Sequence, residues 1–141
     1  MPVLNKTTAP QDILLVEPVT LLRRTVALTI RSLGLAAITE AATYPAARGV
    51  SGTRRFAGAV IAVDAPAQGA VCEGLSLVQR IRSGDSASAA SIPIAVLVEA
   101  CNAELLQVLR ECGVSRVLIK PFRARDVIDT IGAMARQAHA G

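Results

Sequence analysis

The segment VLIKPF, residues 117–122, decides the fold of this chain. Its first three residues form an apolar run typical of a buried strand, and the run ends on Lys120 and Pro121. This ending places one positive charge at the carboxyl edge of a sheet. In open α/β sheets, ligands bind and reactions occur at that edge. The segment therefore predicts a strand of an α/β sheet and makes Lys120 a candidate functional residue.

Outward from this segment, short apolar runs alternate with amphipathic segments. Apolar residues that recur every three or four positions indicate helices, and Gly34 and Gly113 stand where C-cap glycines are expected. Residues 83–91, rich in Ser, Gly and Ala, are predicted to be a flexible link. The predicted strands are residues 13–16, 35–39, 59–63, 94–98 and 117–119, and the predicted helices are residues 19–33, 44–50, 75–81, 105–109 and 127–134.

Five strand–helix units without an internal repeat predict a parallel sheet with helices on both faces. The pattern favours a flavodoxin-like, doubly wound (βα)5 fold with strand order 2-1-3-4-5. One domain is expected, because 141 residues can bury a single core. We expect residues 12–138 to form this domain, with residues 1–11 as a flexible N-terminal tail and residues 139–141, including His139, as a C-terminal tail.

The composition narrows the range of functions. Trp is absent and there are only one Tyr and two Phe, so the stacking platforms of a single-stranded nucleic-acid binder are missing. No apolar run reaches the roughly 18 residues of a membrane span, and residues 1–11 are too polar for a signal peptide. A cytoplasmic protein without a membrane partner is expected. Cys72, Cys101 and Cys112 are widely spaced, which predicts reduced, buried thiols that fill the core.

The net charge of +4 leaves two interpretations open, a solvated surface or a site for an anionic ligand. Thirteen of the fifteen basic residues are arginines, and they are scattered, largely in pairs. No Lys/Arg run and no nucleic-acid motif accompanies them, so a nucleic-acid partner is not expected.

Over roughly residues 12–135 the chain resembles the CheY-like receiver domain of two-component response regulators. The most specific mark is Lys120-Pro121-Phe122, where this family typically has a cis Lys–Pro bond. No GxGxxG or Walker sequence competes for the same sheet. The other marks are residues 13–17 with Arg23-Arg24 downstream, Phe56, Gly74-Leu75, Ile92-Pro93-Ile94 and the stretch from Gly113.

The resemblance implies a phosphorylation pocket at the carboxyl edge. Receivers are phosphorylated on an aspartate at the end of the third strand, and two acidic residues after the first strand hold Mg²⁺. A Thr or Ser after the fourth strand bonds the phosphoryl group, and a lysine follows the fifth strand. This chain keeps Glu17 and Lys120 but has Pro18 in place of the second acid and Val98 in place of the hydroxyl residue. The aromatic residue expected three positions before the lysine is replaced by Val117. The pocket is therefore expected to be degenerate, without catalysis, cofactor or metal.

The phosphoacceptor position has two interpretations. Counting without gaps from Phe56 and from Pro66, both family landmarks, puts Ala62 at this position, and we favour this count. The alternative makes Asp64 the acceptor and shifts both landmarks by two residues. In that case Glu17 and Asp64 are the weak metal candidates and Mg²⁺ is the cofactor.

The resemblance, with these losses, predicts a phosphorylation-independent protein-interaction module of bacterial two-component-type signalling. Lys120 is expected to pair with Glu17, and with Asp64 as a further partner, across the sheet edge. The expected partner is a signalling protein (a histidine kinase, a phosphotransferase or an output protein), with a homodimer as a further option. Receivers usually bind partners through the fourth helix, fifth strand and fifth helix, where four basic residues suit an acidic partner: Arg110, Arg116, Arg123 and Arg125.

Two alternative functions remain. The first is a conventional receiver that is phosphorylated on Asp64 with Mg²⁺. The second is a receiver-like domain that binds an anionic second messenger, such as a cyclic dinucleotide, through arginines whose forked geometry matches phosphate.

Overall fold

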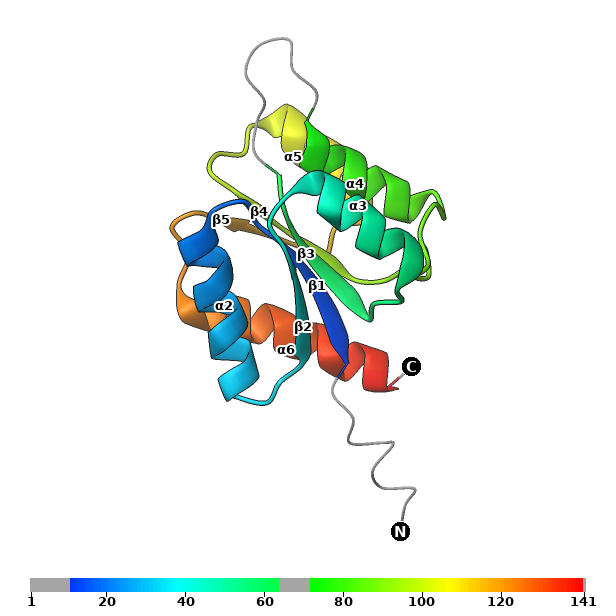
Figure 1. The fold of residues 1–141 in the computed structure, drawn as a ribbon. Coiled ribbons are helices and arrows are strands. Elements are labelled where there is room, and N and C mark those ends of the chain that lie inside the picture. Colours follow the sequence, from blue (N-terminus) through cyan, green and yellow to red (C-terminus); the bar gives the residue numbers. More distant parts are fainter. Residues whose placement is uncertain (1–10, 64–71, 141) are drawn as a thin grey trace.

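A computed structural model describes residues 11–63 and 72–140 as one parallel sheet between two layers of helices (Figure 1). The strand order is β2-β1-β3-β4-β5, which confirms the predicted flavodoxin-like fold. The strands are β1 (Asp12–Val16), β2 (Ala37–Ala41), β3 (Gly58–Ala62), β4 (Ile94–Val98) and β5 (Arg116–Ile119). The helices are α2 (Thr20–Ser32), α3 (Tyr44–Thr53), α4 (Glu73–Arg82), α5 (Ala103–Glu111) and α6 (Ala124–Ala140).

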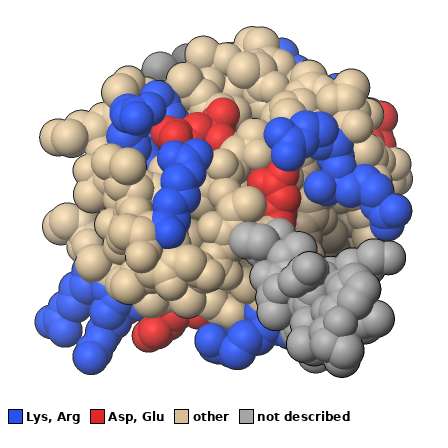
Figure 2. Space-filling view, turned by 60° about the horizontal axis from the view of Figure 1, so that its bottom comes forward, with Lys and Arg blue, Asp and Glu red and all other residues tan. Residues whose placement is uncertain are grey.

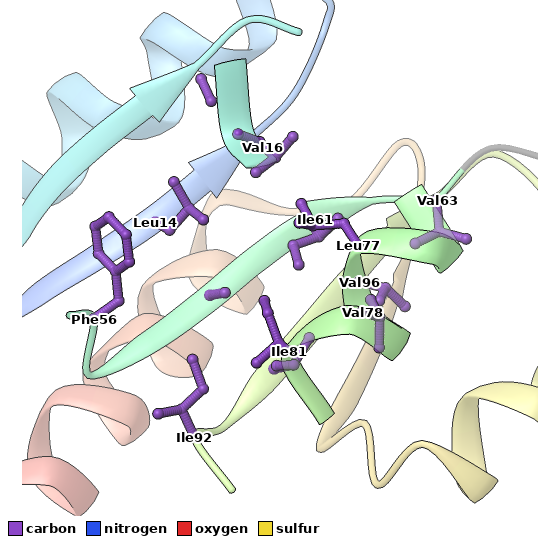
Figure 3. Packing of buried hydrophobic residues seen from close by; sticks show 14 of the residues in the cluster. Leu14, Val16, Phe56, Ile61, Val63, Leu77, Val78, Ile81, Ile92 and Val96 are labelled. Atoms are coloured by element: carbon purple, nitrogen blue, oxygen red, sulfur yellow. The ribbon is translucent and has the colours of Figure 1, made fainter. Parts of the chain in front are cut away.

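The sheet separates two hydrophobic clusters, because successive side chains of a strand point to opposite faces. In β1, Leu14 and Val16 belong to the cluster beneath α3, α4 and α5, whereas Ile13 and Leu15 belong to the cluster beneath α2 and α6. Figure 3 shows part of the first cluster, in which Leu77 of α4 lies beside the strands. The central strands are therefore buried on both faces, which accounts for their continuous apolar runs.

Local sequence signals explain where several helices begin and end. The Thr43 side chain accepts a hydrogen bond from the Ala46 amide at the start of α3, and Asn102 caps α5 in the same way by accepting from the Leu105 amide at 2.8 Å. Gly34 and Gly113 follow the ends of α2 and α5 with φ of 65° and 67°. These left-handed conformations favour glycine, so both predicted C-cap glycines are confirmed.

Several predicted boundaries were wrong. The second strand begins at Ala37 rather than at residue 35, because the Leu35 amide still donates to the Ile30 carbonyl and so belongs to the end of α2. Strand β3 runs one residue earlier than predicted and ends at Ala62. Helix α6 continues to Ala140, so His139 lies within its bounds rather than in a tail.

The segment 83–91 is also not the free link that its composition suggested. Ser88 in this segment is buried, and its hydroxyl accepts a hydrogen bond from the Phe56 amide at 2.8 Å. The Ala87 amide donates to the Ser51 carbonyl at 2.8 Å. The backbone and hydroxyl groups of small residues hold this segment through hydrogen bonds. Composition alone does not show whether such a segment is held in this way or is flexible.

Arg82, at the end of α4, fixes the neighbouring loops. Its guanidinium donates to the carbonyls of Cys112 at 2.6 Å, Ala90 and Ile92 at 2.7 Å, and Gly113 at 3.2 Å. Burial lowers the pKa of Arg82, and an electrostatic interaction with Cys112 acts in the opposite direction. Because arginine titrates far above neutral pH, the guanidinium stays charged and continues to serve all four carbonyls.

The cysteines are less buried than predicted. Cys72, Cys101 and Cys112 are free thiols, each half-buried, and they pack against the margin of the first cluster. Within the described residues, no helix is long and apolar enough to cross a membrane.

Candidate functional site

Glu17, Val98 and Lys120 lie where strands β1, β4 and β5 end. The Glu17 amide donates to the Ala41 carbonyl at 3.2 Å, and the Lys120 amide donates to the Val98 carbonyl at 2.7 Å. These bonds extend the sheet by one residue and fix both backbones. The Lys120–Pro121 peptide bond is cis. The two backbone hydrogen bonds position Glu17 and Lys120 at the carboxyl edge of the sheet.

The structure brings Glu17 and Lys120 together as an ion pair. Lys120 Nζ lies 2.8 Å from Glu17 Oε1, and Glu17 Oε2 accepts a hydrogen bond from the Val19 amide at 2.9 Å. The Glu17 side chain is 0% exposed and that of Lys120 is 14% exposed. A buried carboxylate is stable only with a countercharge and hydrogen bonds; Lys120 supplies the countercharge and the Val19 amide donates a hydrogen bond to Oε2. Because β3 and β4 separate β1 from β5, the pair also joins distant parts of the sheet edge.

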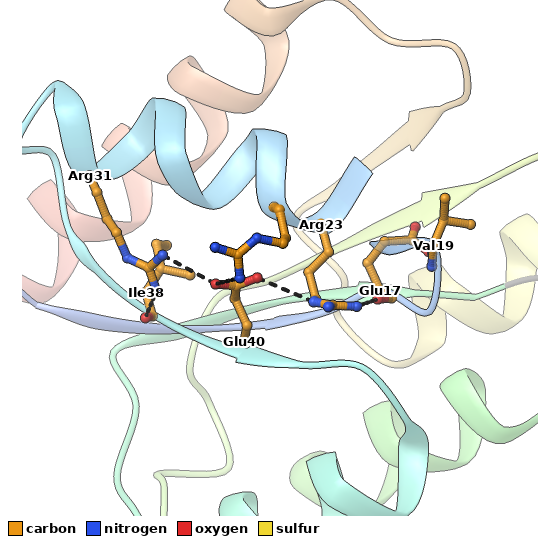
Figure 4. A network of polar contacts seen from close by, with 7 residues as sticks. Glu17, Val19, Arg23, Arg31, Ile38 and Glu40 are labelled. Carbon is orange, nitrogen blue, oxygen red and sulfur yellow. Dashed lines mark hydrogen bonds and ion pairs between the residues drawn. The ribbon is translucent and has the colours of Figure 1, made fainter. Parts of the chain in front are cut away.

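A second polar network holds the chain at Glu17 (Figure 4). Arg23 Nη1 donates to the Glu17 carbonyl at 3.0 Å, and Arg23 Nε donates to Glu40 Oε1 at 3.2 Å. Arg31 pairs with the other oxygen of Glu40 at 3.1 Å. Sequence reasoning did not assign Arg23 this role. The available signal was its spacing, since Arg23 precedes Ala27 and Ile30 by four and seven residues and so lies on the buried face of α2.

Ala62 and Val98 end β3 and β4, and both are fully buried. The Ala62 carbonyl accepts a hydrogen bond from the Tyr44 hydroxyl at 2.7 Å. Gly74 lies so close that a Cβ there would overlap the same carbonyl oxygen. Helices α3 and α4 thus cover the end of β3. Asp64, the alternative acceptor, lies outside the described residues.

A groove of about 480 Å³ opens beside Lys120. It is lined by Leu22, Glu99, Lys120, Pro121 and Phe122, and most of its wall is apolar. Leu21, in the first turn of α2, is 79% exposed. Among the described residues, no group of three or more His, Cys, Asp or Glu is arranged to hold a metal ion.

The four arginines predicted to bind a partner are all exposed: Arg110, Arg116, Arg123 and Arg125. Arg116 is partly neutralised by Asp126, 3.6 Å away. A groove of about 350 Å³ runs along β5 and the start of α6, with Arg116 and Arg123 in its wall. Ile119, in the same wall, is 55% exposed.

Basic side chains do not form a track on the face that Figure 2 presents. They lie there in separate groups, several beside acidic side chains. Such a distribution gives no continuous path for a nucleic-acid backbone on that face.

Comparisons with known proteins agree with this fold. No family model and no curated protein matches the sequence. Among solved structures, a CheY-like receiver domain protein from Methanospirillum hungatei JF-1 superposes with a TM-score of 0.76 at 17% identity, covering 94% of this chain and 98% of its own. The chemotaxis protein CheY4 of Vibrio cholerae gives 0.75 at 23% identity, covering 89% and 99%.

The same fold also appears in a structure described as an adenylate cyclase from Rhodopirellula baltica. That chain gives a TM-score of 0.71 at 21% identity, with 93% of this chain and 91% of its own covered. These likenesses establish that the chain has the fold of CheY-like response-regulator receiver domains.

Proposed function

We propose that this protein is a receiver-fold signalling module that acts by contact with a partner protein and without phosphorylation. The observation that carries the proposal is the ion pair between Lys120 and the fully buried carboxylate of Glu17. In a phosphorylated receiver the lysine would have to hold the phosphoryl group. Here the Lys120 ammonium is already paired with Glu17. Moving the ammonium to a phosphoryl group would leave the buried Glu17 carboxylate without a countercharge.

The neighbouring positions support the same proposal. The Pro18 side chain offers no oxygen ligand, so the end of β1 supplies one carboxylate, that of Glu17, where Mg²⁺ needs several oxygen ligands. Val98 offers no hydroxyl to a phosphoryl oxygen, and Ala62 offers no nucleophile. Phosphoryl transfer depends on positioned charges and donors, so their loss removes most of the catalytic help.

Partner binding is proposed for the surface formed by α5, β5 and the start of α6. Exposed Ile119 lies between Arg116 and Arg123 in the wall of one groove. An apolar contact flanked by arginines matches a protein segment that carries both apolar and acidic side chains. The partner class that fits is therefore an acidic signalling protein.

The phosphorylation part of the proposal has a direct test. We expect incubation with acetyl phosphate and Mg²⁺ to leave the intact mass of the protein unchanged, because neither metal nor phosphoryl group has its ligands. Electrospray mass spectrometry would measure this, with a working receiver treated in parallel. A phosphoryl adduct that disappears in Asp64→Asn would overturn the proposal in favour of conventional phosphorylation on Asp64.

A further inference from the structure

A polar groove lies between α3 and α4, away from the carboxyl edge. The two helices pack side by side over the same face of the sheet (Figure 1). The α3–α4 groove has a volume of about 550 Å³. It is lined by Arg48 of α3 and by Ser76, Gln79, Arg80 and Ser83 at or next to α4.

The charge of this groove is positive, because its lining has two arginines and no acid. Arg48 forms no ion pair with any described residue, and Arg80 pairs with Asp85 at 3.1 Å. The Arg80 and Asp85 side chains are 49% and 66% exposed, so solvent weakens this pair. Displacing Asp85 from Arg80 by an incoming anion therefore requires little free energy.

The donors of the groove match phosphate chemistry. A guanidinium presents parallel N–H groups that bind a phosphate by two hydrogen bonds, and the two guanidinium groups come from opposite walls. The Ser76 hydroxyl and the Gln79 amide add neutral donors. No aromatic side chain lines the groove, so stacking on a nucleobase would contribute little.

We propose that the α3–α4 groove binds a small anion that carries two phosphoryl groups, with Arg48 and Arg80 each holding one. The ligand class covers inorganic pyrophosphate, nucleotides that carry a diphosphate, and cyclic dinucleotides, whose two phosphodiester groups are separated by ribose units. The proposal is independent of the partner-binding function, because the groove shares no residue with the carboxyl edge or with the α5–β5–α6 surface.

Titration calorimetry with pyrophosphate at low ionic strength tests the site. We expect Arg48→Gln and Arg80→Gln each to weaken binding at least about tenfold, since each removes charge-assisted hydrogen bonds. Arg136→Gln is the matched control, because it removes the same charge from an exposed position on α6, on the opposite face of the sheet. We expect it to change the affinity less than about twofold, because an exposed, distant charge is screened.

Asp85→Asn provides a test in the opposite direction. It frees Arg80 from its ion pair, so we expect about two- to threefold tighter pyrophosphate binding.

A cyclic dinucleotide titrated in parallel distinguishes the sources of the phosphates. Equal affinity means that phosphates alone are recognised, and higher affinity means that the rest of the nucleotide contributes. Absence of pyrophosphate binding to the wild type at millimolar concentration, or equal losses in Arg136→Gln and Arg48→Gln, would overturn the proposal.

Discussion

Replacing Lys120 with methionine is expected to lower the free energy of unfolding by about 3–5 kcal/mol, the usual cost of removing one partner from a buried ion pair. The substitution keeps most of the apolar stem but removes the ammonium from Glu17 Oε1, on a side chain that is 0% exposed. The hydrogen bond from the Val19 amide to Oε2 remains, and one neutral donor does not balance a buried charge. Urea unfolding followed by circular dichroism would measure the change.

The double variant Glu17→Gln/Lys120→Met separates the ion pair from general damage to the edge. A glutamine can still accept the Val19 hydrogen bond and leaves no charge behind. We therefore expect the double variant to be more stable than Lys120→Met alone. Equal or greater loss in the double variant would show that Lys120 stabilises the fold through contacts other than Glu17.

Gly74→Ala is expected to destabilise the fold by about 3 kcal/mol, at the upper end of the usual cost of overpacking. The added Cβ would overlap the Ala62 carbonyl oxygen and lie 3.1 Å from Val63 Cα. Both obstacles are backbone atoms, at the last residue of β3 and the residue after it, and they cannot move aside as a side chain can. Thermal unfolding would report the loss as a lower Tm.

Gly49→Ala is the matched control for this substitution. Gly49 lies in α3 with no atom within 4 Å of an added Cβ. Alanine there should raise the free energy of unfolding by about 0.5–1 kcal/mol, because alanine loses less conformational freedom in a helix than glycine. If both variants lose stability alike, α4 does not pack against β3 as closely as described.

The fold could be predicted from the sequence because its signals are local and repeated. Apolar runs such as residues 94–98 are typical of parallel strands that are buried on both faces, and Gly34 and Gly113 mark where helices end. The boundaries were less accurate where backbone hydrogen bonds decide them. Leu35 looks like the start of a strand but completes the turn after α2.

The site could be predicted only in part. Glu17 and Lys120 follow two strand ends that meet at one edge, so their proximity follows from topology. The role of Arg23 depends on the carboxylate of Glu40 on β2, which is 17 residues away in sequence. The α3–α4 groove depends on how these two helices pack against each other. Contacts of this kind are set by tertiary geometry, which residue spacing along the chain does not encode.

We propose that Glu17 holds Lys120 and makes it unavailable to a phosphoryl group. Titration of isotope-labelled protein with beryllofluoride and Mg²⁺, a mimic of the aspartyl phosphate, tests it most directly by amide NMR. We expect the amide signals of Val63, Val98 and Lys120 to keep their positions. Saturable shifts of these three signals would contradict it, because they would show a phosphoryl-like group bound at the carboxyl edge.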